Sequence, residues 1–171
     1  SVYETIVDFM AFTKIERNRV AIVGASGYGG LQLAKLITDH PHFKITYLGG
    51  ERSVGKRWND LNPFINIEND QTIVSPDIED IAKVADYVIL SLPNGLSSQL
   101  TPLLLEKGLK VLDLSADYRF KSLQKWKQVY SSESLKYSRN DSKLCEEAVY
   151  GFSEEFKSEI SECRLVACPG C

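Results

Sequence analysis

The feature that most restricts the fold of this chain is an apolar run that passes through a glycine-rich turn into a helix-like segment. Residues 20–23, Val-Ala-Ile-Val, are apolar and mostly β-branched, which is typical of a strand buried on both faces of a parallel sheet. Glycines follow at positions 24, 27, 29 and 30, and residues 31–37 are rich in leucine, alanine and isoleucine. A chain that contains this unit is expected to continue as alternating strands and helices.

Apolar runs and helix-like stretches do alternate after this first unit. Further β-like runs occupy residues 43–48, 72–74, 87–92, 111–114 and 164–167. Because parallel strands need long crossover connections, the alternation predicts an α/β fold: a Rossmann-like, doubly wound, mostly parallel sheet with helices on both faces. We expect a long loop over residues 51–70, a helix that begins near Ser75-Pro76-Asp77, and another that ends at Gly108. The interior Pro102 leaves the start of that last helix open.

Length and charge restrict the class of protein. The 171 residues suit one α/β domain with at most a short tail. With 20 basic and 23 acidic side chains, the net charge of −3 gives no general attraction to nucleic acid or to an anionic membrane. No apolar run approaches the ~20 residues of a membrane-spanning helix, and the first residues lack the basic start of a signal peptide. We therefore expect a cytoplasmic protein with reduced cysteines that binds neither nucleic acid nor membrane.

Residues 1–18 are expected to form an N-terminal extension that precedes the domain. Met10 is the only methionine in the chain, so it is a candidate for the native start, and residues 1–9 would then be an added segment. A natural extension is the alternative.

The glycine-rich turn carries the first functional signal. Residues 24–30, Gly-Ala-Ser-Gly-Tyr-Gly-Gly, fit G-x-x-G-x-x-G, a variant of the dinucleotide fingerprint, directly after a β-run and at the start of a helix. Without β-carbons the chain can turn sharply, and a pyrophosphate can approach the free N–H groups at the helix start. The alternative is an ordinary tight turn, but the context favours nucleotide binding.

The end of the second β-run usually selects between the two nicotinamide dinucleotides. An acid at that point binds the ribose 2′-hydroxyl of NAD, whereas an arginine accommodates the 2′-phosphate of NADP. Here Glu51 is followed by Arg52 and Ser53, so the acid and the base conflict. Arg52 and Ser53 could hold a phosphate, or they could belong to a solvated basic loop. The residues alone predict a dinucleotide without deciding which one.

Three further clusters follow β-runs and are expected at the same edge of the sheet, where open α/β sheets bind their ligands. They are Pro93-Asn94-Gly95, residues 115–119 and residues 168–171. Ordinary turn chemistry could explain each of them alone. Cys168 and Cys171 also form C-x-x-C, but zinc would need two further ligands at suitable spacing, and a redox pair would be expected after the first strand. No metal site is expected.

Taken in order, these motifs are similar to those of the N-acetyl-γ-glutamyl-phosphate reductases, enzymes of arginine biosynthesis. The resemblance covers residues 19–171, and the stretches that carry it are VAIVGASGYGG, HPHFKI, LSLPNGLS, VLDLSADYRF, VYGFSEEFK and RLVACPGC. It implies an NADPH-dependent reductive dephosphorylation of N-acetyl-glutamyl 5-phosphate to N-acetyl-glutamate 5-semialdehyde. The Cys171 thiolate would attack the acyl phosphate and expel phosphate, and hydride from NADPH would reduce the resulting thioester.

The resemblance also implies roles for individual residues. The pyrophosphate of NADP would lie against Gly24, Ser26, Gly27, Tyr28, Gly29 and Gly30. Arg52 and Ser53 would lie near the 2′-phosphate, and Pro93, Asn94 and Gly95 would pack on the cofactor, with Asn94 where relatives often carry histidine. Ser115 and Arg119 would face the anionic substrate, and Cys168 would be a neighbour of the nucleophile Cys171.

The departure from the family pattern is length. The resemblance implies an NADP-binding domain over residues 19–167, with residues 168–171 as the start of a catalytic and dimerisation domain. In the family that second domain supplies a base histidine, substrate contacts and the interface of a homo-oligomer. The helix that would begin at Cys171 and lower its pKa is missing, so we expect this chain alone to bind NADP without turnover.

Two alternatives to this interpretation stay open. One is an acyl-phosphate reductase of the aspartate-semialdehyde dehydrogenase type, and the other is a non-catalytic NADP-binding module that acts with a partner. A second domain that docks on the chain predicts an exposed apolar patch near residues 160–171, whereas the module predicts a polar surface there.

Overall fold

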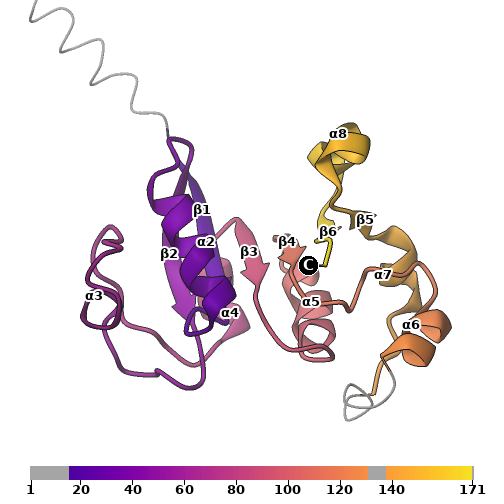
Figure 1. Cartoon of the computed structure of the whole chain (residues 1–171), viewed down its shortest axis with the longest axis horizontal. Helices are drawn as coiled ribbons and strands as arrows, with labels where there is room; N and C mark the ends of the chain where they lie inside the picture. Colours follow the sequence, from indigo (N-terminus) through magenta and orange to yellow (C-terminus); the bar gives the residue numbers. More distant parts are fainter. Residues whose placement is uncertain (1–15, 131–137, 171) are drawn as a thin grey trace, which may run out of the picture.

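A six-stranded sheet organises the part of the chain that the structure describes. The structure is a computed structural model, and it describes residues 16–130 and 138–170 (Figure 1). In spatial order the strands are β2 (Phe43–Gly49), β1 (Asn18–Val23), β3 (Tyr87–Leu90), β4 (Lys110–Asp113), β6 (Leu165–Ala167) and β5 (Val149–Tyr150). All of the strand pairs in these ranges are parallel, so the predicted Rossmann-like sheet is confirmed.

Strand β1 lies between β2 and β3, and both of its faces are buried. Val20 and Ile22 point into one apolar core, whereas Ala21 and Val23 point into the core on the opposite face. Successive side chains of a strand alternate between the two faces of a sheet, so a strand covered on both sides must be apolar at every position. This requirement is why the strand could be predicted from a short continuous apolar run.

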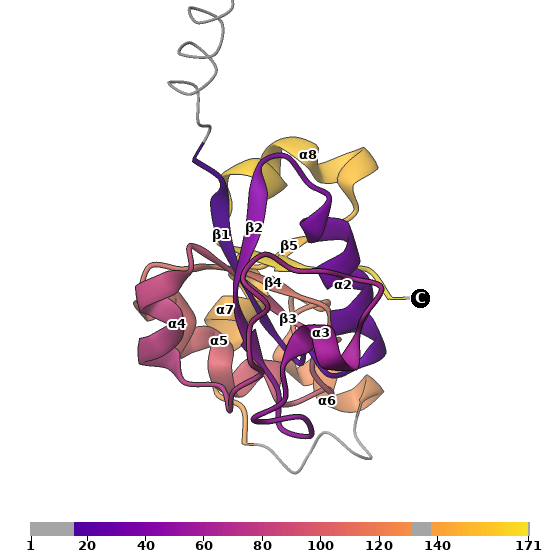
Figure 2. The ribbon, with the colours of Figure 1, turned by 90° about the vertical axis from the view of Figure 1, so that its left-hand side faces the viewer.

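Helices cover both faces of the sheet. They are α2 (Tyr28–Thr38), α3 (Trp58–Leu61), α4 (Ile78–Val84), α5 (Ser97–Glu106), α6 (Leu123–Val129), α7 (Ser142–Glu147) and α8 (Ser153–Glu162). Side chains of α2 and α3 enter the core that contains Ile22, and those of α4, α5 and α7 enter the core that contains Val23. Figure 2 shows α4 and α5 on one side of the strands and α2 on the other, as a doubly wound fold requires. Within the described ranges, no helix combines the length and apolar character that crossing a membrane requires.

The predicted helix ends are present. The carboxylate of Asp77 accepts a hydrogen bond from the amide of Asp80 at 2.9 Å and so caps the N-terminus of α4, with Pro76 just before the cap. Gly108 follows α5 with a φ of +78°, the left-handed conformation that ends many helices. Pro102 lies inside α5, which begins five residues earlier at Ser97.

The prediction that residues 72–74 form a strand is wrong. The segment makes only two isolated bridges, one from Val74 to Gly49 and one from Thr72 to Arg57. Ile73 is fully buried in the same core as Ile22. The segment is therefore apolar because it covers an edge of this core, and burial without ladder pairing gives the same short apolar signal as a strand.

Two short elements are among those that the sequence did not predict. The single-turn helix α3 interrupts the expected loop over residues 51–70, and there the buried indole of Trp58 donates to the carbonyl of Ile65 at 2.7 Å. Strand β5 has only two residues, Val149 and Tyr150, which pair with β6 at the edge of the sheet. Elements of this length are too short to show a helical or strand periodicity.

The chain order creates a switch in direction next to β1. From β1 the chain moves through α2 to β2, and from β2 it crosses back through α4 to β3 on the other side of β1. Connections on either side of this point leave in opposite directions, which opens a crevice beyond the carboxyl ends of β1 and β3. The glycine-rich turn lies at this crevice.

Candidate dinucleotide-binding site

Gly24 is the residue around which the turn after β1 is built. Its φ is +89°, and a β-carbon there would overlap the backbone carbonyl of Ser91, just beyond β3. The amides of Gly24 and Ala25 both donate to the carbonyl of Gly49 at 2.9 Å. The turn is therefore held between the ends of β2 and β3 and has no room for a side chain at its first position.

Helix α2 starts at this turn with its first amide groups available. Gly27 is the N-cap, and within the described residues no side chain caps this end of the helix. The first amides of a helix have no acceptor inside it, and the helix dipole makes this end partly positive. A β-carbon on Gly27 would make only an ordinary van der Waals contact, at 3.6 Å from the carbonyl oxygen of Gly24, so the fold of the described chain does not itself exclude a side chain here. These features fit a phosphate group that approaches the main chain closely.

A cleft of about 670 Å³ opens in front of this turn. Its walls come from the ends of β1, β2 and β3 and from the first turns of α5, and it is lined by Val23, Gly24, Ser26, Gly27, Gly50, Glu51, Arg52, Pro76, Ser91, Leu92, Pro93, Leu96, Gln99 and Leu100. The cleft thus brings together five of the predicted cofactor-binding residues: Gly24, Ser26, Gly27, Arg52 and Pro93.

The other predicted cofactor-binding residues lie beside the cleft. Tyr28 is 80% exposed at the start of α2, and Gly30 is buried in the same turn against Ala25. Gly29 lies between them, and Ser53 follows Arg52 in a turn. Asn94 and Gly95 contact a different loop: the side-chain oxygen of Asn94 accepts from the amide of Ala116 at 2.9 Å, and the amide of Gly95 donates to Asp117 at 2.7 Å.

Glu51 and Arg52 both line the cleft, so the conflict between acid and base persists in three dimensions. The hydroxyl of Ser75 lies 3.5 Å from the Oε1 atom of Glu51, at the limit of a hydrogen bond. Arg52 is exposed at the end of β2 and can reach an anion at the mouth of the cleft. Arg52 is therefore a candidate ligand for a 2′-phosphate.

Ser115 points inward and does not line the cleft. It is buried, and its hydroxyl and amide donate to the two carboxylate oxygens of Asp113 at 2.8 and 2.9 Å. Burial raises the pKa of Asp113 to about 6, against the lowering effect of these hydrogen bonds. The predicted substrate residue Ser115 therefore belongs to a buried hydrogen-bonded pair at the end of β4.

Arg119 joins the ends of β4 and β6. Its Nε donates to the carbonyl of Cys168 at 2.8 Å, and its Nη2 donates to the carbonyl of Leu114 at 2.9 Å. A β-carbon on Gly170 would lie 2.8 Å from Nη1 of the same guanidinium. The predicted substrate residue Arg119 thus lies against the segment that leads to Cys171, which itself is outside the described residues.

The thiol of Cys168 is not suited to nucleophilic attack. Burial raises the pKa of Cys168 to about 11, the carboxylate of Asp113 raises it further, and the charge of Arg119 lowers it only in part. Burial also raises the pKa of Cys145 and of Cys163. Every cysteine within the described ranges is therefore a protonated thiol near neutral pH.

Asp117 is a residue that the sequence did not single out. Its side chain is fully buried and accepts two main-chain hydrogen bonds at the start of α5. An aspartate between Ala116 and Tyr118 in a loop is typical of ordinary turn chemistry, and its partners lie about twenty residues earlier. Only the tertiary structure shows the contact.

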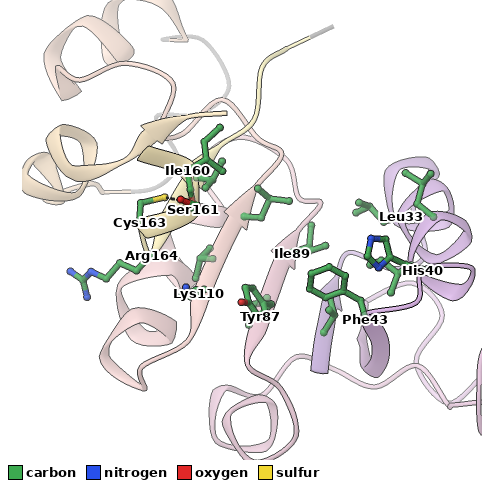
Figure 3. Close-up of a pocket in the computed structure, with 17 residues that line it drawn as sticks. Leu33, His40, Phe43, Tyr87, Ile89, Lys110, Ile160, Ser161, Cys163 and Arg164 are labelled. Atoms are coloured by element: carbon green, nitrogen blue, oxygen red, sulfur yellow. Dashed lines mark hydrogen bonds between the residues drawn. The ribbon is translucent and has the colours of Figure 1, made fainter. Parts of the chain in front are cut away.

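A second, mainly apolar cavity lies on the face of the sheet that α2 partly covers. This groove, of about 480 Å³, has Leu33 and His40 on one side and Ile160 and Cys163 on the other, with Tyr87 between them (Figure 3). Its strand residues lie within the strands, such as Ile89 of β3 and Leu112 of β4, and its lining includes none of the turns that follow the carboxyl ends of β1, β3 and β4, where open α/β sheets bind ligands. We therefore assign the dinucleotide to the cleft at the glycine turn.

Comparison with curated proteins confirms the resemblance that the sequence motifs carry. The chain is 67% identical over 162 residues to the N-acetyl-gamma-glutamyl-phosphate reductase of Prochlorococcus marinus (strain NATL2A), which covers 95% of this chain and 45% of the relative. It is 54% identical over 155 residues to the protein of the same name from Parasynechococcus marenigrum (strain WH8102), which covers 91% of this chain and 43% of that protein. The chain therefore spans less than half the length of these relatives.

Solved structures confirm the fold. Aspartate semialdehyde dehydrogenase II from Vibrio cholerae, complexed with ASA, superposes with a TM-score of 0.60 at 19% identity, covering 90% of this chain and 42% of that one. Aspartate semialdehyde dehydrogenase from Candida albicans, solved with NADP, gives a TM-score of 0.59 at 18% identity over the same shares.

A family model also matches most of the chain. Residues 19–163 match the family described as semialdehyde dehydrogenase, NAD binding domain. The protein therefore belongs to the semialdehyde dehydrogenase family, of which the chain contains the NAD-binding domain.

Proposed function

We propose that the chain is the NADP-binding domain of a reductase that converts N-acetyl-glutamyl 5-phosphate to N-acetyl-glutamate 5-semialdehyde. The observation that carries the proposal is the uncapped start of α2, which faces a cleft that also contains Arg52. The names of the curated relatives support the choice of substrate. On this proposal residues 19–167 form the NADP-binding domain and residues 168–171 begin the catalytic domain.

The proposal gives the dinucleotide one orientation in the cleft. The main-chain amides from Ser26 to Gly30 would hold the pyrophosphate, and Arg52 with Ser53 would hold the 2′-phosphate. The nicotinamide end would then lie toward Pro93 and the ends of β3 and β4. NADPH, when bound, supplies the hydride for the reduction.

The covalent chemistry belongs to Cys171 in this proposal. Its thiolate attacks the acyl carbon, the bond to the phosphate oxygen breaks, and inorganic phosphate leaves. The resulting thioester is reduced, and the aldehyde is released with return of the thiol. Arg119, next to residues 168–170, would stabilise the negative charge of the substrate phosphate. Ser115 would belong to the same substrate-binding loop.

The proposed reductase function predicts how the chain behaves on its own. Because the relatives are more than twice as long, we propose that the 171 residues bind NADP without turnover. Apolar side chains of Ile160, Cys163 and Val166 line the open groove, which supports a docking second domain over a self-contained module. An aspartate-semialdehyde dehydrogenase activity is the second candidate, favoured only by the likeness of fold.

Calorimetric titration of the chain with NADP tests the binding site. We expect one NADP per chain, and we expect Gly27→Val to weaken binding by about 100-fold, because a side chain at this position blocks two charge-assisted hydrogen bonds to phosphate. Because a β-carbon on Gly27 would make only an ordinary contact with the carbonyl oxygen of Gly24, we expect the variant to fold normally.

Gln32→Val is the matched control, since it places the same side chain on an exposed position of α2. It should bind NADP like the unmodified chain. Equal NADP affinity of the Gly27→Val variant and the control would remove the pyrophosphate from the glycine turn.

A further inference from the structure

Asp117 caps the start of α5 from a neighbouring loop. Its Oδ1 accepts from the amide of Gly95 at 2.7 Å, and its Oδ2 accepts from the amide of Ser98 at 2.9 Å. The carboxylate has no exposed surface, and both of its oxygens bind main-chain donors. A charged group at the N-terminus of a helix, shielded from water, makes strong hydrogen bonds to amides there.

The two loops are joined by further contacts. The Oδ1 atom of Asn94 accepts from the amide of Ala116 at 2.9 Å, so the Asp117 loop also donates a hydrogen bond to the loop before α5. The hydroxyl of Ser98 donates to the carbonyl of Gly95 at 2.9 Å and closes the turn before α5. The loop over residues 93–98 is thus fixed at several points to the loop that contains Asp117.

The buried guanidinium of Arg139 is hydrogen-bonded to the loop that contains Asp117. Arg139, which is 6% exposed, donates through Nη1 to the carbonyl of Asp117 at 2.9 Å. Its Nε and Nη2 bind the two carboxylate oxygens of Asp141 at 3.0 and 2.9 Å, and its guanidinium carbon lies 4.3 Å from the ring centre of Trp126. The ion pair and the stacked ring leave the loop little freedom to move.

The first turns of α5 form one wall of the dinucleotide cleft. Pro93, Leu96, Gln99 and Leu100 line the cleft, whereas Gly95 and Ser98 donate their amides to Asp117 outside it. The opposite wall contains Arg52 and the glycine turn. Because β3 lies on the side of β1 away from β2, the α5 wall and Arg52 lie on opposite sides of the glycine turn.

We propose that Asp117 is a positioning residue for the nicotinamide half of the dinucleotide. It lies outside the cleft, and it sets the place of the α5 wall against which that half packs. The adenosine half, held at the glycine turn and Arg52, does not depend on it. The inference rests on the proposed function, since it takes NADP as the occupant of the cleft.

Asp117→Asn in the 171-residue chain tests this proposal with two ligands. Asparagine keeps the shape, but its amide group faces a main-chain N–H and can no longer accept from it. We expect NADP affinity to fall about tenfold, as for one lost hydrogen bond to a charged group. The affinity for adenosine 2′,5′-bisphosphate, which contains only the adenosine half, should change less than twofold.

Asp86→Asn is the matched control, because Asp86 pairs with Arg19 at the other end of β3 and lies outside the cleft. It should leave both affinities unchanged. If Asp117→Asn does not fold, Ser98→Ala takes its place, since it removes the hydroxyl that closes the turn before α5 and should show the same selective loss.

The outcomes separate the two proposals. A selective loss of NADP affinity supports the role of Asp117. Equal losses for both ligands, or no loss, would overturn that role while the binding site stands. If the unmodified chain binds neither ligand, the proposed function itself fails.

Discussion

The carboxyl group of Asp113 is an unusual titratable group near the candidate site. It is fully buried at the end of β4, and burial raises the pKa of Asp113 to about 6 from an ordinary value of 3.8. Between these two pH values the folded chain binds the proton that the unfolded chain has released. Folding stability contributed by Asp113 is therefore full below pH 4 and is lost as the pH rises to about 6.

Asp113→Asn should remove this loss, because asparagine does not titrate and still accepts from the amide of Ser115. The difference in free energy of unfolding between the two proteins should change by about 3 kcal/mol between pH 4 and 7, in favour of the variant at the higher pH. Urea unfolding at several pH values measures it.

The free energy of unfolding of one protein alone would not isolate Asp113, because Asp86 and Glu147 titrate in the opposite sense. Ion pairs with Arg19 and Arg164 lower the pKa of these two carboxyl groups, so their contribution is lost as the pH falls. The contributions of these two groups to the free energy of unfolding are the same in the variant and the unmodified chain, so they cancel in the difference. A difference that does not depend on pH would show that Asp113 titrates normally.

At the scale of elements, local signals predicted some helix ends and long-range contacts decided others. Asp77 caps α4 within three residues, so the end could be predicted from sequence. The start of α5 could not, because its capping carboxylate, Asp117, lies about twenty residues further along the chain. The same holds for residues 72–74, whose apolar character comes from the buried Ile73 and not from strand pairing.

Removing the N-cap of α4 should lower the stability of the folded chain. Asp77→Ala removes the acceptor for the amide of Asp80 and should lower the free energy of unfolding by about 1 kcal/mol. Asp39→Ala, at an exposed position just after α2, is the control and should have little effect. Equal stability of the two variants in urea unfolding would show that the cap contributes nothing.

At the scale of the whole molecule, the parallel sheet explains which predictions of the site succeeded. Chain order alone placed the glycine turn, Arg52 and Pro93 at one edge, and the structure joins them in one cleft. Chain order could not say which way a side chain points, so Ser115 turns inward to Asp113 and Arg119 binds main-chain carbonyls. Side-chain direction depends on packing between loops that are distant in sequence.

We propose that a dinucleotide binds at the carboxyl edge of the sheet, at the start of α2. An NMR titration of the isotope-labelled chain with NADP tests it most directly, since each backbone amide reports its own surroundings. We expect the largest shifts at the amides of residues 26–30, with further shifts at Arg52 and Leu96. Shifts confined to the apolar groove, at Leu36, Ile89 and Val166, would contradict it.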